Sequence, residues 1–470
     1  MHSYKNLING KWVEEGCGGS FEVCNPYTEE VIGTVPKLDI DTIEKAIKTA
    51  SAYHPQLTAY ERYEILRGTA EEVQERREEL SHLISSESGI CLKSTYHEVE
   101  RANQALLFCA EEARRLEGQS FPGDIIPGVR NKIGMTIYQP VGLVLAITPF
   151  NHPLNQVVHK IGPSIAAGNT TVLKPSEKTP LTAIRFAEIL LNNGLPPQML
   201  SVLTCDINKT TDRLLRNPHF DMVTFTGSTQ VGEYIHERIG VKKTLLELGG
   251  NSAFIVMDDA DVDKAIDISV KGAFANSGQR CTSIKRLLVH EEVADRFIPR
   301  FVDSAMQLKC GDPFDEATDV GTVIDEEAAK RIERVVGLAI QDGAKLLYGG
   351  ERNKALYTPT VLDEVDPGSE IVTEETFGPT APIVRFKTLE EAIQITNSTR
   401  YGLQAGICTC NINVAFKAAR EIRTGAVIIN EGPGFRIESF PFGGIKKSGI
   451  GREGISFAVR EMSHLKLIVI

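Results

Sequence analysis

The chain has 470 residues, of which 42% are hydrophobic and 24% charged, with a formal net charge of −11. A chain of this length and composition can form sizeable buried cores, and its length predicts two or more domains. The acidic balance and the lack of a long basic run argue against nucleic acid as the main partner, although a local basic pocket remains compatible with an anionic ligand.

The N-terminal stretch MHSYKNLINGKWVEEG is polar, and we expect no signal peptide there. The longest apolar runs, such as 141–147, are too short to cross a bilayer, so we expect no membrane partner. Nine cysteines lie scattered along the chain, and the one tight pair, Cys408 and Cys410, has C-x-C spacing with no second cluster nearby. We therefore expect no metal site and a reduced cytoplasmic protein whose thiols are mostly structural.

Helical and strand patterns alternate in chain order. A helix is expected from Asp41, because Ile43, Ala46, Ile47 and Ala50 have the spacing of one buried face. The runs 141–147 and 170–175 are typical of strands buried on both faces, and a helical pattern lies between them. A helix at 182–194 and strands at 199–204 and 222–227 follow. This alternation predicts an α/β fold with a doubly wound sheet.

A second α/β pattern runs from about residue 247 to about 440 and includes a helix at 261–275. The chain ends on an apolar run typical of a strand, within 457–470. A terminal strand of this kind leaves an edge that needs a partner, which indicates oligomerisation.

Two motifs follow predicted strands and suit a dinucleotide. GSTQVG, Gly227 to Gly232, places glycines where a backbone can approach a diphosphate at a helix N-terminus, although a plain strand–turn–helix corner would have the same letters. KPSE, Lys174 to Glu177, offers a lysine and an acid to ribose hydroxyls, and the acid disfavours a 2′-phosphate. In isolation, KPSE is better explained as a solvated loop pair.

Three further motifs carry groups that suit nucleophilic chemistry. ELGG supplies a carboxylate, Glu247, that can act as a base in front of two glycines. NSGQRC places Cys281 directly after Arg280, and a nearby cation lowers a thiol pKa. PFN supplies Asn151, whose amide can donate to an oxyanion. Each motif alone is also compatible with an ordinary loop or a structural thiol.

The joint order PFN, KPSE, FTGSTQVG, ELGG, GQRC, EETFGP and PFGGIKKSG resembles the aldehyde dehydrogenase superfamily over residues 140–455, and the N-terminal segments fit as well. The resemblance implies a Rossmann-like cofactor domain (1–117 and 140–246), an α/β catalytic domain (247–446) and a small bridging β-sheet (118–139 and 447–470). It also implies a homodimer or homotetramer and NAD as cofactor, with NADP possible.

The resemblance assigns roles position by position. Cys281 would attack the aldehyde to give a thiohemiacetal and then a thioester, Asn151 would hold the oxyanion, and Glu247 would activate water. The implied cofactor contacts are Lys174, Ser176, Glu177, Gly227, Ser228, Gly249, Glu375 and Phe377.

Four basic residues, Arg101, His152, Arg280 and Arg436, are expected to grip an anionic end of the substrate, because converging guanidiniums form a forked clamp. Their surroundings are similar to the phosphonoacetaldehyde dehydrogenases of the superfamily, so we expect oxidation of phosphonoacetaldehyde to phosphonoacetate. Lactaldehyde, glycolaldehyde, succinate semialdehyde and sulfonated aldehydes stay open, since GIGREG at 449–454 is shared with other branches. A CoA-acylating enzyme is the less favoured alternative, because that branch generally lacks the glutamate at position 247.

Overall fold

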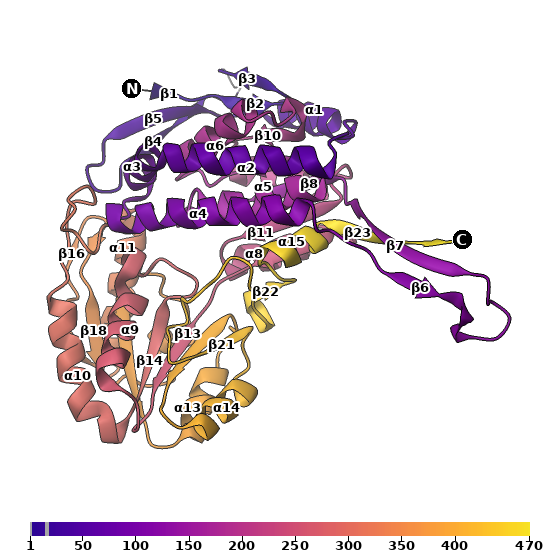
Figure 1. Cartoon of the computed structure of the whole chain (residues 1–470). Coiled ribbons are helices and arrows are strands. Elements are labelled where there is room, and N and C mark those ends of the chain that lie inside the picture. The colour runs from indigo at the N-terminus through magenta and orange to yellow at the C-terminus, as the bar shows by residue number, and fades with distance from the viewer. Residues whose placement is uncertain (1, 15–17) are drawn as a thin grey trace.

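The computed structural model describes residues 2–14 and 18–470. Two large sheets, each covered by helices, form the body of the molecule, and a narrow three-stranded sheet extends from it (Figure 1). Among the described residues no helix combines the length and the apolar character needed to cross a membrane. Eight of the nine cysteines are described and all eight are free thiols, whereas Cys17 lies outside the described residues.

The first sheet has eight strands in the order β22-β12-β11-β8-β9-β10-β2-β3. Its central strands are parallel, and β22, β2 and β3 are antiparallel to their neighbours. The strands are β2 (Asn6–Ile8), β3 (Lys11–Val13), β8 (Leu143–Ile147), β9 (Thr170–Lys174), β10 (Leu200–Val202), β11 (Met222–Thr226), β12 (Lys243–Glu247) and β22 (Gly449–Ile450). The expected strands near 141–147, 170–175, 199–204 and 222–227 are therefore confirmed.

Helices pack on both faces of this sheet. They are α1 (Ile40–Ser51), α2 (Ala59–Glu75), α3 (Arg77–Ser88), α4 (Leu92–Ala113), α5 (Asn155–Ala167), α6 (Pro180–Asn192), α7 (Ile207–Arg216), α8 (Thr229–His236) and α15 (Ile455–Glu461). In α1 the buried residues are Ile43, Ala46, Ile47 and Ala50, which confirms the face expected from the sequence. Every residue of α5 is buried, because the helix is covered on the side away from the sheet by α4 and α15.

The second sheet has seven strands in the order β15-β18-β19-β14-β13-β20-β21. They are β13 (Ser252–Val256), β14 (Ile284–His290), β15 (Lys345–Tyr348), β18 (Thr360–Asp363), β19 (Thr380–Phe386), β20 (Gln404–Cys408) and β21 (Ala426–Ile429). Its helices are α9 (Val262–Phe274), α10 (Glu291–Met306), α11 (Glu326–Gln341), α12 (Glu370–Thr373), α13 (Leu389–Asn397) and α14 (Ile412–Glu421). The second α/β pattern is thus also present, and β21 forms one edge of the sheet.

The extended sheet, here called the arm, consists of β6 (Ser120–Pro122), β7 (Ile133–Pro140) and β23 (Ser463–Val469). The terminal strand pairs with β7 along its length, and the C-terminus lies at the far end of the arm (Figure 1). Apolar side chains on the arm are exposed, including Phe121, Ile133, Leu465, Leu467 and Val469.

The remaining elements are small. A three-stranded sheet combines β1 (His2–Ser3), β5 (Val31–Pro36) and β4 (Ser20–Cys24), and β16 (Arg352–Asn353) pairs with β17 (Leu356–Tyr357). Short 3₁₀ turns lie at Gly123–Ile125, Pro197–Met199, Ala275–Gly278 and Lys446–Ser448.

Candidate active site

The motifs found in the sequence meet at one edge of the first sheet. In the parallel register, Ile147 of β8 pairs with Lys174 of β9 and with Phe225 of β11, and Thr226 pairs with Glu247 of β12. PFN, KPSE, GSTQVG and ELGG therefore all follow the carboxyl ends of neighbouring strands. That edge is where open α/β sheets bind their ligands.

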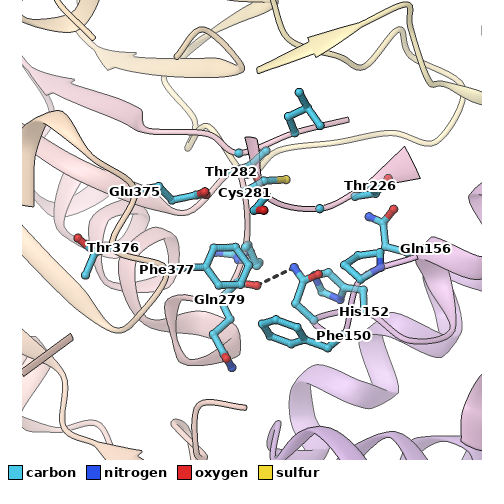
Figure 2. Close-up of a pocket in the computed structure, with 18 of the residues that line it drawn as sticks. Phe150, His152, Gln156, Thr226, Gln279, Cys281, Thr282, Glu375, Thr376 and Phe377 are labelled. Carbon is cyan, nitrogen blue, oxygen red and sulfur yellow. Dashed lines mark hydrogen bonds between the residues drawn. The ribbon is translucent and has the colours of Figure 1, made fainter. Parts of the chain in front are cut away.

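A cavity of about 320 Å³ lies between the two large sheets, and Cys281 is in its wall (Figure 2). Of the residues expected from sequence, the lining includes Arg101, Asn151, His152, Gly227, Ser228, Gly249, Arg280, Cys281, Glu375, Phe377 and Arg436. Glu247, Lys174, Ser176 and Glu177 are not part of this lining. Figure 2 shows Glu375, Thr376 and Phe377 on one side of Cys281 and Phe150, His152 and Gln156 on the other.

The segment 276–281, here called the catalytic loop, is held in an unusual backbone conformation. Asn276, Ser277 and Gly278 all have positive φ, at 59°, 52° and 68°. Such backbone costs free energy and persists only where its surroundings hold it, as functional sites often do. Here Asn276 Nδ2 donates to the Asn151 carbonyl at 3.2 Å, and Ser277 Oγ donates to the Gly321 carbonyl at 3.0 Å.

Cys281 is the last residue of this loop and is partly exposed to the cavity. Burial and, to a smaller extent, the carboxylates of Glu375 and Glu247 together raise the pKa of its thiol to about 12. The structure therefore does not show the lowering of the thiol pKa that a neighbouring cation was expected to cause, because desolvation outweighs it.

Asn151 lies beside the catalytic loop. Its Nδ2 donates a 2.7 Å hydrogen bond to the carbonyl oxygen of Gln279. An asparagine amide has two N–H groups, so one is still available for an oxygen in the cavity. The bond to Gln279 fixes the direction in which that second N–H points.

Glu247 is the last residue of β12 and is buried behind the cavity wall. Neither carboxylate oxygen has a hydrogen-bond partner among the described residues. Burial raises the pKa of Glu247 well above its usual range, and the nearby carboxylate of Glu453 adds to the rise. A raised pKa suits a general base working near neutral pH, but the side chain must turn toward the cavity to reach a water there.

Arg280 lines the cavity without a carboxylate against it among the described residues. Its Nη2 donates to the carbonyls of Lys271 and Gly272 in the last turn of α9, at 3.1 and 3.3 Å, and its Nε is buried with no partner. Burial lowers the pKa of this guanidinium to about 10, with Arg101 adding to the decrease. An arginine held in this way retains unused hydrogen-bonding capacity for an anion in the cavity.

Arg101 and Arg436, in contrast, share one buried carboxylate. Arg101 Nε donates to Glu438 Oε1 at 2.7 Å, and Arg436 Nε lies 3.2 Å from Glu438 Oε2. Burial alone would raise the pKa of Glu438, but the charges of His159, Arg436 and Arg101 outweigh it and lower that pKa. Both arginines nevertheless line the cavity, so their positions there depend on Glu438.

A buried polar cluster on α5 was missed by the sequence analysis. His159 Nε2 lies 2.8 Å from Glu438 Oε2, and Lys160 Nζ donates to Glu453 Oε1 at 2.6 Å. Burial lowers the pKa of His159, and the positive charge of Arg436 lowers it further. The detectable signal was a helix without a polar face that still carries two basic residues, since such residues need buried partners.

His152, the fourth expected basic residue, also has an acidic neighbour. Its Nδ1 lies 3.1 Å from Glu98 Oε2, and Glu98 Oε1 accepts backbone N–H bonds from Leu154 and Asn155 at the start of α5. The carboxylate thereby orients the imidazole and satisfies the N-terminal turn of the helix.

The expected cofactor residues form a cradle around the strand ends. Ser228 caps α8 by accepting from the Val231 N–H at 3.4 Å. A Cβ added to Gly249 would lie 2.5 Å from Glu375 Oε2, so a larger residue there would displace the Glu375 carboxylate. Glu375 Oε1 accepts from the Gly250 N–H at 3.1 Å, and the rings of Phe150 and Phe377 meet edge-on at 5.9 Å.

KPSE lies farther along the same edge. Lys174 is buried and donates to the Pro175 carbonyl at 3.2 Å, whereas Glu177 lines a second cavity together with Glu22 and Asp325. With a helix N-terminus at Ser228, a close backbone approach at Gly249 and a lysine after β9, these residues fit an extended dinucleotide.

The fold and the site together place Cys281 in the wall of a cavity that lies at the carboxyl ends of the parallel strands of an α/β protein. The model of the aldehyde dehydrogenase family matches residues 12–468, and the chain belongs to that family. This confirms the expected fold class, the enzyme class and a nicotinamide dinucleotide as cofactor.

Relatives support the same conclusion. The chain is 40% identical to a 3-sulfolactaldehyde dehydrogenase of Priestia aryabhattai, with 100% of this chain and 98% of that protein covered. It is 42% identical to a lactaldehyde dehydrogenase of Methanocaldococcus jannaschii, with 99% of each covered. A solved structure of glyceraldehyde-3-phosphate dehydrogenase from M. jannaschii complexed with NADP has a TM-score of 0.92 and 42% identity, covering 96% of this chain and 98% of that one.

Proposed function

We propose that the chain oxidises a short aldehyde with an anionic group at its far end to the corresponding carboxylate, with NAD or NADP as the oxidant. The observation that carries this proposal is Arg280, which lies next to Cys281 in the cavity wall and contacts backbone carbonyls rather than a carboxylate among the described residues. A partly buried guanidinium without a counter-charge favours a ligand that brings one.

The positions of the other basic residues are compatible with binding of the same anionic group. Arg101, His152 and Arg436 line the same cavity, so a tetrahedral anion could accept from several of them at once. Sulfonate, phosphonate and phosphate groups all present three oxygens in this way. Phosphonoacetaldehyde remains our hypothesis from the sequence, and 3-sulfolactaldehyde is a second candidate because a relative 40% identical over the whole chain is named for it.

In the proposed mechanism the Cys281 thiolate forms a bond to the aldehyde carbon, giving a thiohemiacetal oxyanion. The free N–H of Asn151 Nδ2 and the backbone N–H of Cys281 hold that oxyanion. When bound, the nicotinamide accepts the hydride that leaves this carbon. Loss of the hydride leaves a thioester on Cys281.

Release of the product requires water. Glu247 takes a proton from a water molecule while the oxygen attacks the thioester carbon, and the Cys281–carbon bond breaks to regenerate the thiolate. Because the CoA-acylating branch generally lacks the glutamate at position 247, its presence here favours transfer of the acyl group to water over transfer to CoA. Product formation without CoA distinguishes these two routes.

For the cofactor we propose NAD as the preferred form, with NADP possible. Glu177 follows β9, where a carboxylate accepts from ribose hydroxyls and repels a 2′-phosphate. We assign Lys174, Ser176 and Glu177 to the adenosine half and Gly227, Ser228, Gly249, Glu375 and Phe377 to the diphosphate and nicotinamide half.

We further propose a cytoplasmic homodimer or homotetramer with the domain limits expected from sequence. Within 447–470, β23 is the part that belongs to the arm, whereas β22 joins the first sheet and α15 packs on α4 and α5. The exposed apolar residues of the arm and the free edge of β21 are complementary surfaces for a second copy.

Lactaldehyde and 3-sulfolactaldehyde differ only by the sulfonate, so they form a matched pair for testing the substrate class. We expect the sulfonated aldehyde to give the higher kcat/KM, and Arg280→Ala to reduce this preference by about tenfold or more. Arg280→Lys should restore part of the preference, because it keeps the charge but loses the fork. An equal loss of kcat/KM for both aldehydes in Arg280→Ala would refute the proposal. Phosphonoacetaldehyde and sulfoacetaldehyde, compared in the same assay, decide between the two anions.

A further inference from the structure

Lys285 is a buried cation that takes no part in the proposed mechanism. It is the second residue of β14, its side chain is 1% exposed, and it takes part in no ion pair within 4 Å among the described residues. Its Nζ donates a 2.5 Å hydrogen bond to the carbonyl oxygen of Gly278 and lies 5.1 Å from the centre of the Phe377 ring. Burying an ammonium with so few partners costs free energy, which indicates that Lys285 has a function at this position.

The ammonium lies where two strained segments meet. Gly278, in the catalytic loop, has a φ of 68°, and Phe377 has a φ of 52°. A Cβ on Gly278 would lie 2.0 Å from the carbonyl oxygen of Gly378, so the two backbones are in direct contact. Lys285 contacts one segment through a carbonyl and the other through an aromatic face, which attracts cations.

The charges around Lys285 connect it with the cofactor residues. Burial is the main reason that the pKa of Lys285 is lowered to about 8, and the positive charge of Arg280 acts in the same direction. The negative charges of Glu375 and Cys281 act in the opposite direction and favour the ammonium. Burial likewise raises the pKa of Glu375 to about 7, with Lys285 as the main opposing charge. Glu375, Arg280 and Cys281 are the titratable groups that act on this ammonium.

We propose that Lys285 is a positioning residue for the nicotinamide half of the cofactor site. Its ammonium holds the catalytic loop through the Gly278 carbonyl, and it holds the Glu375–Phe377 segment through the Phe377 ring and the Glu375 charge. The Lys285 side chain thereby adds to the backbone contact between Gly278 and Gly378 in holding the cofactor segment at a set distance from Cys281. This inference rests on the cofactor roles of Glu375 and Phe377 under the proposed function, but it does not depend on which aldehyde is the substrate.

Lys285→Met tests the proposal, because it removes the charge and keeps a long apolar stem in the buried site. We expect the dissociation constant of the reduced cofactor, measured by fluorescence titration, to rise by about tenfold, equivalent to ~1.4 kcal/mol. The KM for the cofactor should rise and kcat should fall, whereas the KM for the aldehyde should stay the same. Unchanged cofactor binding and kcat in a variant that melts like the wild type would overturn the proposal.

The pH dependence of the wild type provides a second test that needs no altered protein. The ammonium is present below the pKa of Lys285 and is lost above it, so cofactor affinity should decrease above about pH 8. In Lys285→Met this decrease should be absent. An alkaline decrease of the same size in both proteins would show that another group is responsible.

A separate pair of variants distinguishes failure of this inference from failure of the proposed cofactor site. If Glu375→Gln and Phe377→Ala leave cofactor binding unchanged, the assignment of those residues is wrong. If both variants weaken binding and Lys285→Met does not, only the role of Lys285 is wrong.

Discussion

Arg101 Nε donates a 2.7 Å hydrogen bond to Glu438 Oε1, joining helix α4 to the loop that follows β21. The same carboxylate lies 3.2 Å from Arg436 Nε, so one buried residue holds two of the guanidiniums in the cavity wall. The two arginines come from opposite parts of the chain and are far apart in the sequence. Their convergence therefore depends on Glu438, a residue to which the sequence assigned no role.

Glu438→Gln should lower kcat/KM for an anionic aldehyde by about tenfold to a hundredfold, because Arg101 and Arg436 lose the charge that orients them. The value for neutral lactaldehyde should change much less. Glu438→Asp should restore part of the loss, and kinetics with the matched lactaldehyde pair compare both variants with the wild type. If anionic and neutral aldehydes lose equally, Glu438 is structural rather than a determinant of specificity.

Glu247→Gln should separate the two halves of the reaction. The amide cannot take a proton from water, so the thioester should accumulate after a normal first turnover. We expect a burst of reduced cofactor close to one per subunit followed by a slow steady state, together with a mass increase on the peptide that contains Cys281. Cys281→Ser should show neither effect. If Glu247→Gln instead forms reduced cofactor slowly from the start and without a burst, the carboxyl of Glu247 acts in the first step of the reaction.

Glu177→Ser should raise the ratio of kcat/KM for NADP to that for NAD by about tenfold, because a carboxylate that repels the 2′-phosphate is removed. Glu22→Ser is the matched control, since Glu22 lines the same second cavity. An unchanged ratio in Glu177→Ser would mean that the adenosine ribose binds elsewhere.

The exposed apolar residues of the arm allow the proposed assembly to be tested. Leu465 and Leu467 lie on one face of β23 and are 59% and 58% exposed, so a second copy is expected to cover them. The double variant Leu465→Asp, Leu467→Asp should shift the mass found by light scattering toward the monomer. Lys466→Ala, on the opposite face of the strand, should leave the mass unchanged. A wild-type monomer would contradict the proposed assembly directly.

Much of the fold could be predicted because its elements have strong local signals. The face of α1 and the doubly buried strands β8 and β9 follow from periodicity and apolar runs, which depend only on neighbouring residues. The motifs lie at the ends of β8, β9, β11 and β12, and the parallel register of these strands brings them to one edge of the sheet. The roles of the residues in those motifs remain proposals.

The sequence by itself determined which chemical groups are present: a cysteine, a carboxylate and an amide in motif order, with basic residues beside them. Only the tertiary structure decided how those groups are charged and held. Burial sets the raised pKa of Cys281 and of Glu247, and it brings Glu438 and Lys285 against residues that are distant in the sequence. Desolvation and the pairing of buried charges depend on three-dimensional packing, and no pattern of neighbouring residues encodes them.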